Sequence, residues 1–153
     1  MGINMAWDKT EIINYCRTKC EKRIIEIQSA MESAQDAILN DTKSSMGDKY
    51  ETSREMAQQE ISRLQTQLQQ AEIDLDKINN LNIEPSEHVK VGSIVITDQF
   101  DYFIAISIGA VKIGEKSIMV ISKESPIGNL LFSKKVGDEV QFNGKTLNIE
   151  GII

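Results

Sequence analysis

Two runs of apolar residues recur in alternating steps of four and three and mirror each other about a polar gap. The first run is Cys20, Ile24, Ile27, Met31, Ala34 and Ile38. The second is Ala57, Ile61, Leu64, Leu68, Ala71, Leu75 and Ile78. Such steps form the apolar seam of a coiled-coil helix. Counted outward from the gap, the two runs match step for step, so Ala34 faces Ile61 and Ile24 faces Ala71. The sequence therefore predicts an antiparallel coiled-coil hairpin over residues 1–81, with its tip at about 41–50.

Helix start signals support this interpretation. Asp8 followed by Glu11 fits an N-cap with a reciprocal glutamate, and Trp7 before it can pack as a hydrophobic staple. The pair Asp48 and Glu51 repeats the pattern after a short polar loop over 41–47. Helices of roughly 30 residues at ~1.5 Å per residue give a rod of about 45 Å.

The pattern changes after Pro85 from a period of 3.5 to a period of 2. Residues 82–153 are expected to form a small, mostly antiparallel sheet with one short helix, so the predicted fold class is α+β. The expected strands cover 93–97, 100–107, 116–122, 140–142 and 146–149. Ser125 to Phe132 suits a short helix with Pro126 at its first position. Asn143-Gly144 suits a two-residue hairpin turn.

Composition limits the functions of the chain. It carries a net charge of −6, and acidic residues outnumber basic ones in both halves. Direct binding to nucleic acid through phosphate neutralisation is therefore not expected, and contact with nucleic acid would come through a protein partner. No stretch approaches the roughly 18 apolar residues that cross a bilayer, and the start lacks a signal-peptide pattern. We expect a cytoplasmic monomer without membrane contact.

No set of residues forms an enzyme site. Cys16 and Cys20 lie on one helix face, but a metal site needs about two more ligands, and the chain has a single histidine, His88. We expect core cysteines, no metal on the free protein and no cofactor of its own.

The tip concentrates charges of both signs. Asp41, Lys43, Asp48 and Lys49 are the candidate functional residues there. Asp48 can serve as a helix cap or reach a metal ion, and Asp41 can be a solvated loop acid or a metal ligand. Lys43 and Lys49 can be solvated or contact RNA phosphate.

The segment from Ser125 to Val140 reads SPIGNLLFSKKVGDEV. It resembles the SP-x-G-x-x-L-x-x-K-x-x-G-D motif of the bacterial Gre-type (GreA/GreB) transcript cleavage factors, and the resemblance extends over nearly the whole chain. It implies a helical hairpin over 1–81 followed by an FKBP-like sheet domain over 82–153. The docking candidates that it implies are Ser125, Pro126, Gly128, Lys135, Gly137 and Asp138.

The resemblance implies a transcription elongation factor whose partner is RNA polymerase. In Gre-type factors the sheet domain docks at the rim of the polymerase's secondary channel. The hairpin reaches down the channel, where two tip carboxylates help to hold a Mg²⁺ shared with the polymerase, which then cleaves backtracked RNA. Such a factor is not itself an enzyme.

The tip departs from the family pattern GDLxENAEY. When its Tyr is placed on Tyr50, Lys43 and Met46 occupy the positions of the metal-holding acids, and only Asp41 and Asp48 offer carboxylates nearby. Three interpretations stay open. The first is a regulator that binds RNA polymerase at the secondary channel and modulates elongation or the cleavage of backtracked RNA. The others are a Gre-like antagonist without cleavage and a coiled-coil adaptor or structural module unrelated to polymerase.

Overall fold

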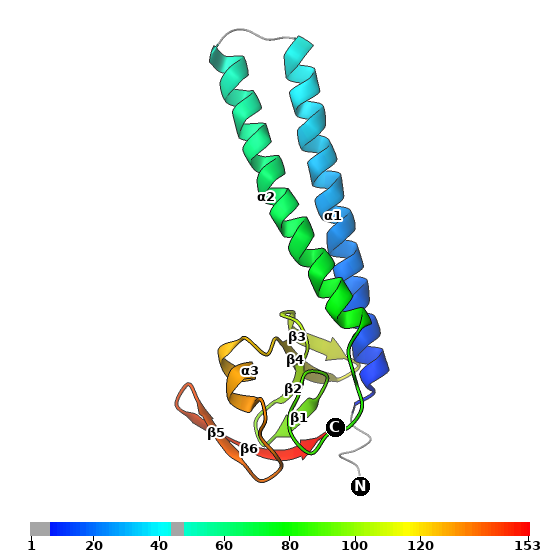
Figure 1. Ribbon diagram of the computed structural model, residues 1–153, viewed down its shortest axis with the longest axis vertical. Helices are drawn as coiled ribbons and strands as arrows, with labels where there is room; N and C mark the ends of the chain where they lie inside the picture. The colour runs from blue at the N-terminus through cyan, green and yellow to red at the C-terminus, as the bar shows by residue number, and fades with distance from the viewer. Residues whose placement is uncertain (1–6, 44–47) are drawn as a thin grey trace. The chain divides into compact units, whose positions relative to one another are not determined.

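The computed structural model describes the backbone of residues 7–43 and 48–153 and the side chains of residues 7–40 and 52–153. Two long helices come first, and strands with one short helix follow (Figure 1). The predicted α+β class, a helical hairpin followed by a sheet with one short helix, is confirmed.

The two long helices are α1 (Lys9–Lys43) and α2 (Asp48–Asn79). Asp8 precedes α1, and its Oδ1 accepts a hydrogen bond of 2.9 Å from the Thr10 backbone N–H. Its carbonyl also accepts from the Ile12 N–H at 3.2 Å. The predicted cap at Asp8 is thus present. The second helix begins at Asp48 itself, one residue earlier than a cap at that position would place it.

The two helices pack through the predicted seam. Ile27, Leu64 and Ala71 are buried in one cluster, with further seam residues against them: Ile24, Met31 and Leu68. Arg23 and Asp74 form an ion pair at 3.7 Å. Each directly precedes a seam residue, so this pair fixes the same antiparallel register as the apolar cluster.

The sheet has six strands in the order β3-β4-β2-β1-β6-β5. Their bounds are β1 Ile94–Thr97, β2 Asp101–Ile104, β3 Gly109–Ile113, β4 Lys116–Ile121, β5 Glu139–Phe142 and β6 Lys145–Ile152. The short helix α3 covers Pro126–Leu131. The β5–β6 turn holds Asn143 at φ 51° and Gly144 at φ 77°, as the predicted two-residue turn requires.

One feature of the sheet differs from the prediction. The strand β3 was not expected, because Val111 is its only buried residue and the apolar alternation is therefore weak. It forms an antiparallel hairpin with β4, and β4 lies between β3 and β2. This placement makes the β2–β4 ladder parallel, whereas the other ladders are antiparallel, so the sheet is mostly antiparallel.

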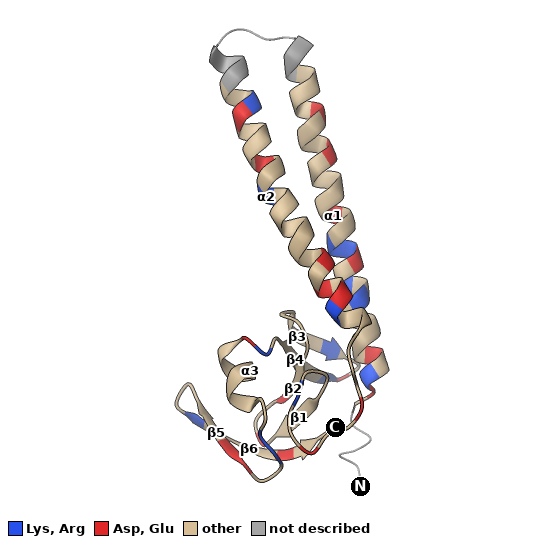
Figure 2. Cartoon of the chain, viewed as in Figure 1, with Lys and Arg blue, Asp and Glu red and all other residues tan. Residues whose placement is uncertain are grey.

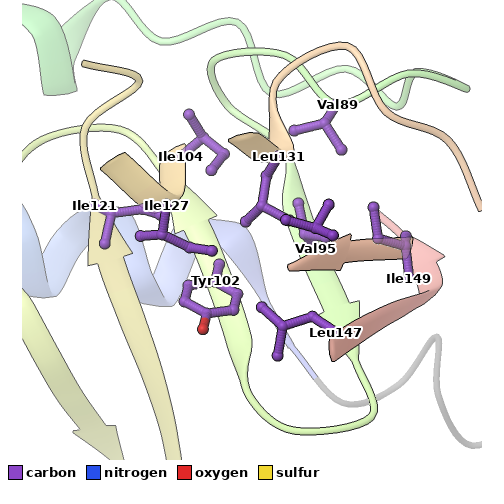
Figure 3. Packing of buried hydrophobic residues seen from close by; sticks show 10 residues of the cluster. Val89, Val95, Tyr102, Ile104, Ile121, Ile127, Leu131, Leu147 and Ile149 are labelled. Carbon is purple, nitrogen blue, oxygen red and sulfur yellow. The ribbon is translucent and has the colours of Figure 1, made fainter. Parts of the chain in front are cut away.

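One apolar cluster joins α3 to a face of the sheet. Tyr102 and Val95 come from neighbouring strands, and Ile127 and Leu131 come from the helix (Figure 3). Other members are Val89, Ile104, Ile121, Val140, Leu147 and Ile149. This core holds α3 and the loop that follows it against the sheet.

By its contacts the chain divides into two units, residues 1–16 with 77–153 and residues 17–76. The predicted ranges were 1–81 and 82–153. The start of α1 groups with the sheet because the Trp7 Nε1–H donates to Asp101 Oδ2 at 2.8 Å. The Lys9 ammonium also donates to the Ile83 carbonyl at 2.9 Å. Trp7 is therefore held by the sheet and does more than staple a helix end.

Candidate functional site

The four candidate residues of the tip lie at the adjoining helix ends. Asp41 and Lys43 belong to the last turn of α1, and Asp48 and Lys49 to the first turn of α2. The side chains of residues 41–51 lie outside the described residues. The chemistry expected of these four residues, and of Met46, therefore stays a prediction.

The motif segment begins with a helix cap. Ser125 has an extended backbone, and its Oγ accepts from the Gly128 N–H at 3.0 Å. The same hydroxyl donates to the Ser122 carbonyl at 2.7 Å. Pro126 takes the first helical position, where its missing N–H costs nothing. Both residues thus set the start of α3.

Gly128 allows a close backbone approach. A Cβ built at this position would lie 2.0 Å from the Ser122 carbonyl oxygen and 2.8 Å from the Ser125 Oγ. No side chain fits there without moving the main chain. The glycine of the motif is therefore required by the packing of α3 against the end of β4.

Gly137 and Asp138 fasten the loop after α3 to β6. Gly137 has φ 95°, and its N–H donates to the Ile149 carbonyl at 2.9 Å. The Asp138 carboxylate accepts from the Lys135 N–H at 2.9 Å, and its carbonyl accepts from the Ile149 N–H at 2.9 Å. Five of the six predicted docking residues therefore shape the segment, and the side chains of Pro126 and Lys135 are exposed.

The exposed residues of this segment include apolar and basic ones, beside the polar Asn129 and Ser133 and the acidic Glu139. Leu130 is 40% exposed and Val136 is 55% exposed. Lys134 and Lys135 are exposed beside them. We call these four residues the docking patch. The motif letters pointed to this segment but not to Leu130 or Val136, because exposure is set by the loop's path and not by the sequence.

A shallow hollow adjoins the docking patch. It has a volume of about 330 Å³ and is lined by Pro85, Ser86, Glu87, Val136 and Ile152. The linker is held beside it, because the Val89 N–H donates to the Lys134 carbonyl and the Ser133 N–H donates to the Val89 carbonyl, both at 2.8 Å.

A second hollow of about 360 Å³ lies between the start of α1 and the β3–β4 turn. Its aromatic wall is Trp7, and the Lys116 ammonium lies 5.8 Å from the centre of that ring. The ring nitrogen is committed to Asp101.

The two cysteines both lie on α1. Cys16 and Cys20 are buried thiols, and burial, followed by the nearby Asp74 carboxylate, raises the pKa of Cys20. Among the side chains of residues 7–40 and 52–153, no group of three or more potential metal ligands gathers. No helix in this part of the chain is long and apolar enough to span a membrane.

Solved structures similar to this chain include three whose descriptions name Gfh1. GreA factor homolog 1 (Gfh1) of Thermus thermophilus is 18% identical, with 90% of this chain and 94% of that chain covered at a TM-score of 0.37. A second structure, described as the transcription factor Gfh1, is 18% identical, with 90% of this chain and 92% of that chain covered at a TM-score of 0.37. Gfh1 of Thermus aquaticus is 20% identical, with 90% of this chain and 93% of that chain covered at a TM-score of 0.35. No family model and no curated protein matches the chain.

Proposed function

We propose that this chain is a Gre-type regulator of transcription elongation that binds RNA polymerase through the secondary channel. The observation that carries the proposal is the segment from Ser125 to Asp138. It matches the family motif in sequence, and its serine, proline, glycines and aspartate each build the local backbone. Because these motif residues shape one stretch of backbone, they support the proposal more than matching letters alone would.

The hairpin supports the same proposal. Its helices have 35 and 32 residues, and at ~1.5 Å per residue they extend about 50 Å. The helices pack through an apolar cluster of the seam, formed by Ile24, Ile27, Met31, Leu64, Leu68 and Ala71. Such a hairpin can hold a short charged tip well away from its base, as entry into a channel requires.

The docking patch is proposed to make the contact with the polymerase rim. Its exposed valine and leucine would supply burial, and its two lysines would attract an acidic surface. Any contact with nucleic acid would come through the polymerase. The factor itself is proposed to have no enzymatic activity.

Binding can be tested by co-purification with RNA polymerase and by competition for elongation complexes. Val136→Asp should weaken binding by about tenfold or more, because it places an unpaired carboxylate in the contact. Ala110→Asp, on the exposed edge strand β3, is the matched control and should bind like the wild type. If the wild-type chain does not bind polymerase, the proposal is wrong, and the interpretation as a coiled-coil adaptor remains.

The tip decides which kind of regulator this is. Placing Lys43 and Met46 at the family's acid positions favours an antagonist that occupies the channel without cleavage. If Asp41 and Asp48 replace the missing acids, they could hold a Mg²⁺ already partly bound by the polymerase, since Mg²⁺ takes only one or two carboxylates from most proteins.

The two kinds of regulator can be separated with stalled, backtracked polymerase. The wild type is compared with Asp41→Asn and Asp48→Asn. Stimulated cleavage that is lost in either variant, with binding retained, indicates a cleavage factor. Binding without stimulation by the wild type indicates the antagonist. Asp48→Asn is the cleaner probe, because asparagine is tolerated as well as aspartate at a helix start.

A further inference from the structure

Lys9 is a buried lysine in the first turn of α1, where Figure 2 shows charges of both signs. Its neighbours Asp8 and Glu11 are exposed, whereas Lys9 is only 8% exposed. A lysine is seldom buried unless a carboxylate pairs with it. Among the side chains that the structure describes, no carboxylate forms an ion pair with Lys9. The burial of this amine therefore has another basis.

The linker before the sheet holds the Lys9 amine. Its Nζ donates to the Ile83 carbonyl at 2.9 Å. The linker itself lies against the turn at Gly92, because a Cβ built on that glycine would lie 2.1 Å from the Asn82 carbonyl oxygen and 3.7 Å from the Ile83 Cα. The start of α1, the linker and this turn are therefore joined around one amine.

A second cation acts on the same amine. Lys90 begins the turn, and its N–H donates to the Ser93 Oγ while the Ser93 N–H donates to the Lys90 carbonyl, both at 3.0 Å. Burial, with a smaller effect from the Lys90 charge, lowers the pKa of Lys9 to about 8. Near neutral pH, a much larger fraction of Lys9 than of a solvated lysine is therefore the neutral, nucleophilic amine.

We propose that Lys9 is a reversible modification site at which carbon dioxide forms a carbamate. The Nζ lone pair forms a bond to the carbon of CO₂, one C=O electron pair moves onto oxygen, and the nitrogen releases one of its two protons to water. The remaining N–H can still donate to the Ile83 carbonyl. The new carboxylate gives the Lys90 ammonium a partner of opposite charge. This inference does not depend on the proposed function.

The surroundings of Lys9 favour carbon dioxide over a larger acyl donor. A buried amine can admit a small uncharged molecule, whereas an enzyme that transfers an acyl group needs access to the side chain. Acetylation would only remove the positive charge of Lys9. A carbamate replaces that charge by a negative one, so that the repulsion between Lys9 and Lys90 becomes an attraction.

Labelled carbon dioxide tests the proposal on the full chain. The protein is equilibrated with ¹³C-bicarbonate at pH 7.5, and carbamates are trapped as esters with a trialkyloxonium salt and located by peptide mass spectrometry. The N-terminal amine, whose ordinary pKa is about 8, is the positive control. Lys112, exposed on β3, is the negative control in the same sample. Lys9 should carry at least about tenfold more adduct than Lys112.

Two variants test the roles of the two lysines. Lys9→Arg keeps the positive charge and a donor for the Ile83 carbonyl but has no nucleophilic amine, so the adduct should be lost there and kept at the N-terminus. Lys90→Gln should lower the Lys9 adduct by about threefold, because the carbamate loses its cation. Lys112→Gln is the matched control and should leave the Lys9 adduct unchanged.

Stability gives an independent measurement. The carbamate pairs with Lys90 only in the folded chain, so dissolved CO₂ should raise the urea midpoint of the wild type and leave that of Lys9→Arg unchanged. A labelled N-terminus with an unlabelled Lys9 would overturn the proposal, and this result needs no variant. Equal labelling of Lys9 in the wild type and in Lys90→Gln would contradict it as well. An acyl group on Lys9 that persists without CO₂ would mean acyl transfer and would also overturn it.

Discussion

At the scale of single residues, Gly128 is the position with the least freedom in the motif segment. A β-carbon there would meet the Ser122 carbonyl at 2.0 Å. Gly128→Ala should lower the free energy of unfolding by about 1–3 kcal/mol, since overpacked sites must shift their backbone. Urea unfolding of the full chain measures this change. Asn129→Ala, at the exposed next position, is the control, and equal stability of the two variants would contradict the close approach.

Lys9 is a residue whose burial predicts a pH dependence. It is only 8% exposed, and burial, with a smaller effect from the Lys90 charge, lowers its pKa to about 8. The unfolded chain keeps the ordinary value of 10.5, so between these values it binds more protons than the folded chain. Stability should therefore rise as the pH increases from about 8 to 10.5.

Lys9→Met should remove that rise, because methionine has no proton to lose. Urea midpoints at pH 7, 8.5 and 10 would show it, with the exposed Lys112→Met as the control. An unchanged pH slope in Lys9→Met would mean that another group titrates in this range.

At the scale of elements, the seam gives the hairpin its stability. Leu64 is 4% exposed and lies in the cluster with Ile27 and Ala71. Leu64→Asp should destabilise the hairpin by at least about 3 kcal/mol, because it buries an unpaired charge. Ser62→Asp, exposed on the same helix, should melt nearly like the wild type. Helical signal followed during heating checks both variants, and similar melting of the two would contradict the register.

The hairpin and its register could be predicted because a seam period is local and repeats many times. Most strands could be predicted for the same reason, as could α3, where Ser125 and Pro126 mark the start. The strand β3 could not, since Val111 alone carries its pattern. The parallel β2–β4 ladder depends on which strands become neighbours, and no single segment encodes that choice. The motif letters located the segment in the sequence. They did not show which of its residues shape the backbone and which, such as Val136, lie exposed on its surface.

At the scale of the whole molecule, residues distant in sequence close the sheet unit. The Trp7 ring donates to Asp101, a residue 94 positions later. Trp7→Phe keeps most of the ring but loses this donor, so the free energy of unfolding of the sheet unit should fall by about 1 kcal/mol. Hydrogen exchange at the β1 and β2 amides reports on that unit. A double-mutant cycle with Asp101→Asn isolates the bond, and fully additive effects would mean that the bond contributes nothing.

The same bond has a consequence for how the chain emerges from the ribosome. The hairpin's contacts are complete once residue 76 is made, so residues 17–76 can fold early. Trp7 and Ile12 must wait for β2, and with synthesis at about 5–20 residues per second the 94-residue separation corresponds to roughly 5 to 20 s. During that time the nascent chain carries an apolar leading segment whose binding surface does not yet exist. Slow translation through residues 77–101 would lengthen this exposure, and a chaperone that binds short apolar segments could protect it.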